Sequence, residues 1–316
     1  MLAPCPRLPC IAIRFPLPTG IGSNNKGDVV GMTSLPQGLW WHAFRWTAAA
    51  GMEDLGTLSD ASVAVAINDN GVVTGHSGTA DGHGHSFVWT RAGGMVDIGT
   101  LGGGTESFPV AVGPLGEAIG YSIATLPPDY YQRAYRWTAA GGMRDLGALS
   151  GVESYPLAVS KKSHIVGVVD WSDQSQHGFS WTVQRGMVDL GSLAGGNSAA
   201  LHVNIQDQIV GDAVDQDGNP RAVIWAPGQA IADLNKRLVN APAGMVIEVA
   251  TGIADNGVIV AESNAGTVVL RPLGEAIIDA PVVGPIAAPA LGRVGSAIAS
   301  KLAFTDANPS DLHHVS

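Results

Sequence analysis

The sequence is built from a repeat of about 45 residues, and this repeat limits the folds that are open to the chain. The clearest copy covers residues 42–75 and reads HAFRWTAAAGMEDLGTLSDASVAVAINDNGVVTG. A segment that ends in tryptophan recurs every 43 to 48 residues, at Trp46, Trp89, Trp137, Trp181 and Trp225, with a degenerate sixth copy that ends at Leu270. A unit this small cannot bury its apolar faces alone, so neighbouring copies must pack against one another.

Each copy predicts about four short strands. The segments HAFRWT, GMEDLG and SVAVAIN are separated by turn residues, and VVTG follows an Asn-Asp-Asn-Gly turn whose residues accept the positive φ of a hairpin. Glycine accounts for 42 of the 316 residues and charged residues for only 14%, which is typical of short strands joined by tight turns. We therefore predict an all-β fold, a β-propeller with six blades of about 45 residues, with an open β-solenoid as the alternative.

The repeat also divides the chain into three parts. We expect a poorly ordered N-terminal segment over residues 1–19, the propeller over residues 20–280, and an Ala-, Pro- and Gly-rich C-terminal tail over residues 281–316. The first copy begins near Gly20 and lacks its opening strands in the sequence pattern. If the ring closes, strands from both ends of the repeat region are therefore expected to share one blade.

The motifs HAFRWT, GMEDLGTL and AINDNGVVTG, which recur in the same order over about residues 20–279, resemble the HAF repeat family of bacterial extracellular proteins. This resemblance implies a β-repeat protein that is secreted or displayed on the cell surface, and it brings no catalytic residue with it. The N-terminal sequence MLAPCPRLPCIAIRFPLPTG departs from that expectation, because it has neither the charged start nor the unbroken apolar core of a signal peptide.

Charge and composition exclude several classes of partner. The net charge is −10 and no cluster of Lys or Arg occurs, so a nucleic-acid partner is not expected. The longest apolar run, residues 276–291, is interrupted by Asp279 and prolines and is too short to cross a membrane. Cys5 and Cys10 have no His or Cys nearby with which to bind a metal. We expect a monomer without a cofactor.

A basic register recurs in the tryptophan strand, four positions before the tryptophan. It is occupied by His42, His85, Arg133, His177 and Arg221, and an Asp follows in the next strand of each copy. These residues could pair within each blade, form a ring that collects anions, or act as catalytic His-Asp pairs. A single active site needs one constellation and not five copies, so we favour structural pairs.

Residues that break the repeat are the better candidates for a binding site, because loops on a rigid scaffold carry function. The third copy has a longer loop with Asp129, Tyr130 and Tyr131, and aromatic side chains dominate recognition surfaces. In the fourth copy, Trp171 stands outside the tryptophan register, beside two Asp residues. An exposed Trp next to carboxylates would suit a platform for a sugar.

Two weak metal signals and one carboxylate pair complete the candidates. His83 and His85 form a His-x-His segment on one strand, and Asp215 and Asp217 resemble the start of a calcium loop without its Glu at the twelfth position. Neither is strong enough for us to predict a metal site. Glu106 and Glu153 precede recurrent serines and could act as paired carboxylates near a propeller axis.

These observations favour a non-enzymatic protein that serves as a binding or interaction scaffold for an unknown ligand, either carbohydrate or protein. The alternative is a polysaccharide hydrolase or lyase whose site lies at the central funnel of the propeller.

Overall fold

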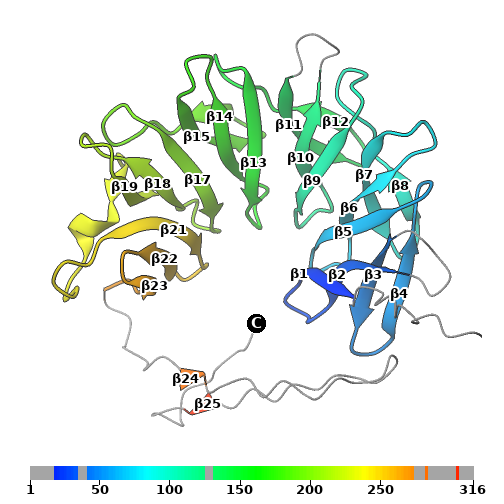
Figure 1. Cartoon of the computed structure of the whole chain (residues 1–316), viewed down its shortest axis with the longest axis horizontal. Helices are drawn as coiled ribbons and strands as arrows, with labels where there is room; N and C mark the ends of the chain where they lie inside the picture. The colour runs from blue at the N-terminus through cyan, green and yellow to red at the C-terminus, as the bar shows by residue number, and fades with distance from the viewer. Residues whose placement is uncertain (1–17, 35–40, 125–130, 274–281, 284–303, 306–316) are drawn as a thin grey trace, which may run out of the picture. The chain divides into compact units, whose positions relative to one another are not determined.

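Each repeat folds into one antiparallel sheet, and the strands of a sheet pair in chain order (Figure 1). The computed structural model describes residues 18–34, 41–124 and 131–273, together with residues 282–283 and 304–305. Most of the N-terminal segment predicted over residues 1–19 therefore lies outside the described residues. The chain divides into two units, Met1–Leu270 and Arg271–Ser316.

The first unit contains six sheets of three or four strands. The first two sheets are β1 (Thr19–Ser23), β2 (Val29–Ser34), β3 (Trp41–Thr47), β4 (Gly51–Gly56), and β5 (Ser62–Ile67), β6 (Val73–Gly78), β7 (Gly84–Thr90), β8 (Gly94–Asp97). The third and fourth are β9 (Ser107–Val112), β10 (Ala118–Ile123), β11 (Gln132–Thr138), β12 (Gly142–Asp145), and β13 (Glu153–Val159), β14 (Ile165–Asp170), β15 (Gln176–Thr182), β16 (Gly186–Asp189).

The last two sheets differ from the others at their outer edge. The fifth comprises β17 (Ser198–Val203), β18 (Ile209–Val214), β19 (Pro220–Trp225) and the short β20 (Ala232–Asp233), which leads into the 3-10 helix η1 (Leu234–Arg237). The sixth has only β21 (Ile247–Ile253), β22 (Ile259–Ser263) and β23 (Gly266–Leu270). In the second unit, β24 (Val282–Val283) pairs with β25 (Phe304–Thr305). The described part of the chain contains no helix with the length and hydropathy needed to cross a membrane.

The all-β class is confirmed, and the first copy contains a strand that its sequence pattern does not show. Strand β1 pairs with β2 from Thr19↔Met32 to Ser23↔Val29 and completes a four-stranded first sheet. The sequence TGIGS hides this strand, because glycines at every second position remove the apolar alternation that identifies a strand. Among the described strands, no sheet combines residues from both ends of the repeat region.

The antiparallel order separates the connections into two groups. The turns between first and second strands, and between third and fourth strands, emerge at one end of every sheet, which we call the turn end. The loops between second and third strands, and the links to the next sheet, emerge at the opposite end, which we call the loop end. In Figure 1 the first strands, such as β9, β13 and β17, lie on the inner side of the curve of sheets.

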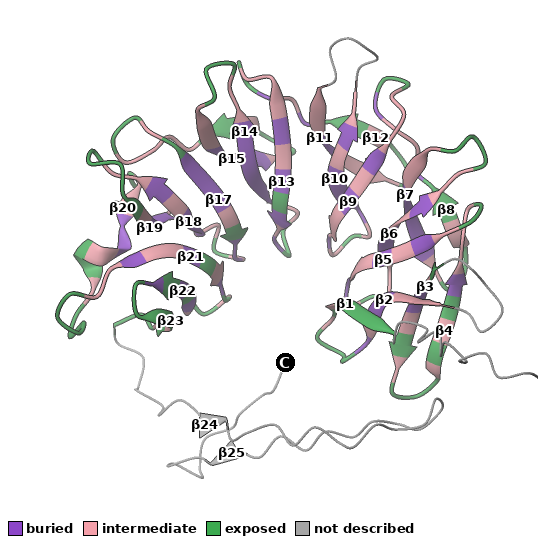
Figure 2. Ribbon diagram, in the orientation of Figure 1, coloured by how far each residue is buried: buried purple, intermediate pink, exposed green. Residues whose placement is uncertain are grey.

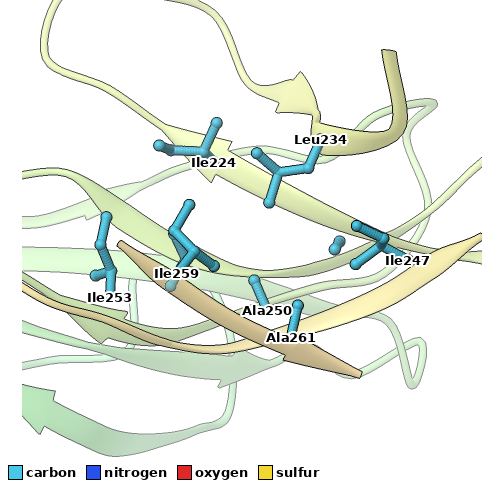
Figure 3. Packing of buried hydrophobic residues seen from close by; sticks show 9 residues of the cluster. Ile224, Leu234, Ile247, Ala250, Ile253, Ile259 and Ala261 are labelled. Atoms are coloured by element: carbon cyan, nitrogen blue, oxygen red, sulfur yellow. The ribbon is translucent and has the colours of Figure 1, made fainter. Parts of the chain in front are cut away.

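The hydrophobic core is divided into five clusters, which lie between successive sheets. Trp89 packs with Val30 and Ala43 of the preceding sheet, and Trp181 and Trp225 lie in equivalent positions with 3% and 5% of their surface exposed. The cluster between the fifth and sixth sheets contains no tryptophan and is built from aliphatic side chains (Figure 3). Buried positions accordingly concentrate within the sheets, and exposed positions in the turns and loops (Figure 2).

The tryptophan register is therefore a core register where a preceding sheet exists. In the first sheet, which no earlier sheet of the described residues precedes, Trp46 is 37% exposed. The core reading of the tryptophans is thus confirmed for Trp89, Trp181 and Trp225, and it does not hold for Trp46.

A recurrent glycine in the second strand makes this packing possible. A Cβ atom on Gly120 would lie 2.0 Å from the carbonyl oxygen of Phe108 and 2.7 Å from the hydroxyl of Tyr135. Gly75, Gly167 and Gly211 are equally crowded by the first strand of their own sheets. A side chain at this position would displace both the first strand and the aromatic residue of the third strand.

We predict that Gly120→Ala lowers the free energy of unfolding by about 1–3 kcal/mol, because the added methyl group cannot fit without moving backbone. Gly252→Ala is the matched control, since a Cβ at Gly252 meets no atom within 4 Å. Urea denaturation measures both variants. Equal stability of the two would contradict this account of the recurrent glycine.

Candidate functional site

The recurrent histidines pair with the recurrent aspartates of the next strand. In the first sheet, Nδ1 of His42 lies 3.0 Å from both carboxylate oxygens of Asp54. The same contact, at 2.9 to 3.2 Å, joins His85 to Asp97 and His177 to Asp189. Of the three roles considered for this register, the geometry in these copies is that of a pair within one sheet.

The pair belongs to a larger hydrogen-bond network that we call the latch. Oδ1 of Asp54 accepts the N–H of Gly56 at 2.8 Å, and the carbonyl of Gly56 accepts the hydroxyl of Ser62 at 2.6 Å. The same hydroxyl oxygen accepts the N–H of Ala43 at 2.8 Å, which returns the network to the residue after His42. Because Ser62 belongs to the next sheet, the latch joins two successive sheets.

The serine arm of the latch recurs in three further copies. Ser107, Ser154 and Ser198 accept the backbone N–H groups of Ser86, Ala134 and Gly178 at 2.8 to 3.0 Å, and donate to the carbonyls of Gly99, Gly147 and Gly191 at 2.6 to 2.8 Å. All four serines are buried, and each hydroxyl both donates and accepts. None of them is therefore placed as a free nucleophile.

The two arginines of the register behave differently, so the pairing expected in every copy is wrong for them. Nη2 of Arg221 lies 2.9 Å from Oδ2 of Asp215, in the loop of its own sheet, and not against Asp233. In the described part of the chain, no ion pair joins Arg133 to Asp145, and Asp145 instead accepts the N–H of Gly147. A guanidinium is longer than an imidazole and reaches past the position where the shorter ring meets the aspartate.

The metal candidates do not assemble a ligand set. No group of three or more His, Cys, Asp or Glu that could hold a metal occurs among the described residues. The imidazole of His85 is bound to Asp97, while His83 lies in a hairpin turn where its N–H donates to Asp81. The turn that resembles a calcium loop is closed by Asp215, whose Oδ1 accepts the N–H of Asp217 at 2.9 Å.

The predicted aromatic loop falls largely outside the described residues. This applies to Asp129 and Tyr130, so their role as a contact for a ligand or partner stays a prediction. Tyr131 is half-buried, and its carbonyl accepts the N–H of Ala124 at 2.9 Å at the base of the loop.

At the turn end, asparagine side chains link the turns of successive sheets into a belt. Oδ1 of Asn68 accepts two N–H groups of its own turn at 3.0 Å, and its Nδ2 donates to the carbonyl of Gly113 in the next sheet at 2.7 Å. Asn24 and Asn204 make the same kind of bond. Nδ2 of Asn24 donates to the carbonyl of Asn68 at 3.0 Å, and Nδ2 of Asn204 donates to the carbonyl of Ala254 at 3.1 Å. An aspartate could accept the local bonds but could not donate across the sheets.

Where the asparagine or the turn glycine is replaced, other side chains also link the sheets. Ser163 and Asp207 occupy the turn position that glycine holds in the other copies, with φ of 60° and 59°. A left-handed non-glycine residue costs roughly 1–2 kcal/mol. Both side chains are engaged across sheets: Ser163 bonds to Glu117, and Asp207 lies 3.0 Å from Nδ1 of His164.

A cavity of about 220 Å³ lies among the turns of the first four sheets. Its residues include Asn68, Asp69 and Lys161, which belong to the turns described above or adjoin them. Hydrogen bonds from Asn25 hold the pKa of Asp69 below its ordinary value, and Nζ of Lys161 lies 2.9 Å from Oδ2 of Asp255 in the sixth sheet. These charged groups are already paired within the protein, so we assign this cavity to the frame.

A larger cavity, of about 380 Å³, lies at the loop end beside the fourth and fifth sheets. We call it the Trp171 cleft. Its side chains come from the ends of β13 and β14, the loop that follows β14, the start of β15 and the link into β17: Glu153, Asp170, Trp171, Gln174, Gln176 and Asn197. The sequence already drew attention to Trp171 as a departure from the repeat, with Asp170 as one of the two Asp residues beside it, and to Glu153 as a carboxylate before a recurrent serine.

The ring of Trp171 is less exposed than the sequence suggested. It is half-buried, packs against the cluster between the third and fourth sheets, and meets the ring of His177 edge to face at a centroid distance of 5.7 Å. A tight turn folds it back, since the N–H of Trp171 donates to the carbonyl of Ser175 at 2.9 Å. The expectation of an exposed Trp171 is therefore wrong: the residue is half-buried and lines one side of a cleft.

Two carboxylates stand side by side in the cleft. Glu153 and Asp170 are directly opposite one another in the pairing of β13 with β14, so their side chains share one face of the sheet. The oxygens of Glu153 accept the hydroxyl of Tyr155 at 2.9 Å and the N–H of Gln132 at 3.2 Å. Burial and the bond to Glu153 raise the pKa of Tyr155 well above its ordinary value, so this hydroxyl stays a donor.

The amides of the cleft leave hydrogen-bonding groups unused. Oδ1 of Asp170 accepts Nε2 of Gln176 at 2.8 Å, and the backbone N–H of Gln176 donates to Oδ1 of Asn197 at 3.0 Å. Within the described part of the chain, no bond engages Oδ2 of Asp170, Oε1 of Gln176 or Nδ2 of Asn197. The sequence alone did not identify Gln176 and Asn197 as site residues, because the only feature that distinguishes them in the sequence is their position next to loops.

The two carboxylates that the sequence offered as a pair, Glu106 and Glu153, have different neighbours. Glu153 stands opposite Asp170, whereas Glu106 lies in the third sheet near His76. Burial lowers the pKa of His76, and the negative charge of Glu106 opposes that shift.

The sequence matches no family model and no curated protein. The structure is similar to a puromycin hydrolase S511A mutant complexed with PGG, at 16% identity and a TM-score of 0.50, over 82% of this chain and 45% of that one. It is also similar to TolB from Acinetobacter baumannii, at 12% identity and a TM-score of 0.44, over 69% of this chain and 53% of that one. A putative gluconolactonase matches at 12% identity and a TM-score of 0.36, over 72% and 79% of the two chains.

These similarities concern the fold alone. The chain spans about half the length of the puromycin hydrolase and of TolB. Together with the six sheets, the match to the puromycin hydrolase supports a propeller-like all-β repeat fold.

We predict that Ser154→Ala lowers the free energy of unfolding by about 1–3 kcal/mol, because it leaves the N–H of Ala134 and the carbonyl of Gly147 buried without a partner. Ser172→Ala, at an exposed loop position, is the control. Chemical denaturation of both variants measures the difference. A loss no larger than that of the control would show that the latch does not hold the sheets.

A second prediction concerns Asp212 in β18, where burial raises the pKa of the carboxyl group above its ordinary value of 3.8. The folded state therefore loses stability as the pH rises from that value through the folded pKa. Asp212→Asn should stabilise the protein at neutral pH and have no effect at a pH well below 3.8. Thermal melting against pH tests this, with Asp217→Asn at an exposed position as the control; a variant that is no more stable at neutral pH would contradict it.

Proposed function

We propose that this chain is a non-enzymatic carbohydrate-binding protein and that its ligand lies in the Trp171 cleft. The observation that carries the proposal is the combination, in one cavity, of an indole with amide and carboxylate groups that the fold leaves unused. A pyranose ring has an apolar face of C–H groups and a rim of hydroxyls. An aromatic side chain and a few oriented polar groups are the complement of such a surface.

The position of the cleft in the repeat supports this proposal. The recurrent His, Asp, Ser and Asn side chains are occupied by the latch and the belt, where they hold sheets together. Trp171 is outside the recurrent tryptophan register, and a cavity of about 380 Å³ is within the usual range of about 300–1,000 Å³ for small-ligand sites. The groups that remain for recognition are Trp171 and the polar side chains near it that neither the latch nor the belt uses.

The proposal includes the frame and its location. We propose that the six sheets are the blades of one propeller, in preference to an open solenoid. The apolar residues that are exposed at the two ends of the series, Trp46 in the first sheet and Val260 and Val269 in the sixth, would be covered if those sheets packed together. The resemblance to the HAF repeat supports an extracellular or cell-surface location.

One observation favours an enzyme as the second candidate. Glu153 and Asp170 are two adjacent carboxylates, and glycoside hydrolases use two. Both oxygens of Glu153, however, already accept bonds from the protein, and the pair lies in a single sheet. Two carboxylates that share one face leave no group on the opposite side of a bound glycosidic bond, so binding without cleavage is the better supported function.

We predict that Trp171→Ala weakens binding of soluble oligosaccharides at least about 10-fold, which corresponds to about 1.4 kcal/mol of lost stacking. Isothermal titration against a panel of cello-, xylo-, manno- and chito-oligosaccharides measures the affinities. Trp41→Ala, which removes an exposed tryptophan from the first sheet, is the control and should bind as the unaltered protein does.

The same incubations are assayed for reducing ends and for unsaturated products. Unchanged binding by Trp171→Ala would move the site away from the cleft. Release of products by the unaltered protein, lost in Glu153→Gln, would replace the binding proposal with the enzyme.

A further inference from the structure

We infer that the Trp171 cleft selects sugars that carry a protonated amine, such as glucosamine units, over neutral and acidic sugars. This inference rests on the proposed carbohydrate site and specifies its ligand. It follows from the juxtaposition of Glu153 and Asp170 beside the indole of Trp171, in a cleft that no Lys or Arg of the described chain lines.

The charge arrangement is the first step. Glu153 and Asp170 are directly opposite across β13 and β14, and like charges in that position destabilise a sheet pair. Among the described residues, a basic ring beside the cleft is that of His177, which meets Trp171 edge to face and contacts the carboxylate of Asp189. An ammonium group placed between the carboxylates would offset their repulsion, whereas a sugar carboxylate would add to it.

The cleft also offers more hydrogen-bond acceptors than donors. Each oxygen of Glu153 accepts one bond from the protein and retains a lone pair, and Oδ2 of Asp170 and Oε1 of Gln176 accept none from the described residues. The free donors are the amides of Gln174 and Asn197 and the second N–H of Gln176, since the indole N–H of Trp171 is buried without a partner among the described residues, and the free acceptor lone pairs outnumber these donors. An ammonium is a donor with three N–H groups and no acceptor, and it fits such a surface.

The indole is the third, independent contribution. The electron-rich face of Trp attracts a cation that lies within about 6 Å of the ring centre. Trp171, Asp170 and Glu153 line the same cavity, so an amine bound there lies in the same cleft as the ring. Because Tyr155 and Gln132 hold both oxygens of Glu153, this carboxylate is fixed before the ligand arrives.

The test uses three tetrasaccharides that share the same β-1,4 backbone and differ only at C2. They are cellotetraose with a hydroxyl, N-acetylated chitotetraose with an amide, and fully deacetylated chitotetraose with an ammonium. Isothermal titration of the full chain at mildly acidic pH, at low and at high salt, gives the three affinities. We expect the deacetylated form to bind at least about 10-fold more tightly than cellotetraose and to lose this advantage at high salt.

The carboxylate variants assign the preference to residues. Asp170→Asn and Glu153→Gln should each reduce the advantage of the deacetylated form about 10-fold, while the affinity for cellotetraose changes little. Asp173→Asn removes the same charge from the exposed part of the same loop and should leave the preference intact. Thermal melting confirms that each variant is folded, and if Glu153→Gln fails to fold, Asp170→Asn carries the test.

The outcomes separate this inference from the proposed function. Equal affinity for the three tetrasaccharides, lost in Trp171→Ala, would overturn the amine selectivity and leave the carbohydrate site standing. Binding of none of the oligosaccharides by the folded protein would overturn both. Displacement of the deacetylated sugar by an equal concentration of a lysine-rich peptide would identify a protein side chain as the ligand and would also overturn the inference.

Discussion

The latch is the interaction on which the rest of the structure depends. In the first copy, His42 bonds to Asp54, and Asp54 accepts the N–H of Gly56. The carbonyl of Gly56 then accepts the hydroxyl of Ser62, a buried serine of the following sheet. A single four-stranded sheet cannot bury both of its faces, so the position of each sheet against the next decides whether a core exists. The latch fixes that position at the loop end, and the asparagine belt fixes it at the turn end.

Between these two sets of bonds the aromatic residues pack. In the second, third and fourth sheets, a glycine of the second strand makes room for the aromatic residue of the third strand, and Trp89 of the second sheet meets the preceding sheet. The cleft lies beside this repeated arrangement. Glu153 and Asn197 occupy the same place in successive copies, one residue before the latch serine, and each accepts an N–H from the preceding sheet. Their remaining atoms, with Trp171, face a cavity that the frame does not fill.

Much of the frame could be predicted from the sequence, because repetition makes a weak signal visible several times. The sequence was sufficient to predict the period, the strand order within a copy, and the turns at Asn68 and its equivalents. Strand β1 could not be predicted, because its glycines mask the apolar alternation of a strand. The ion pair of Arg221 with Asp215 could not be predicted either, because several aspartates lie within reach of a long side chain once the chain is folded. Trp171 was found as an exception to the repeat, but its burial and its amide neighbours depend on loops far apart in the chain.

The central claim is that recurrent residues hold the frame and that the exceptional residues of one cleft bind the ligand. The most direct test is a two-dimensional NMR titration that follows the indole N–H signals of the eight tryptophans as oligosaccharide is added. The account predicts that the signal of Trp171 moves in a saturable manner, while those of the buried Trp89, Trp181 and Trp225 stay in place. A shift confined to another tryptophan, or no shift at all when the sugar binds, would contradict it.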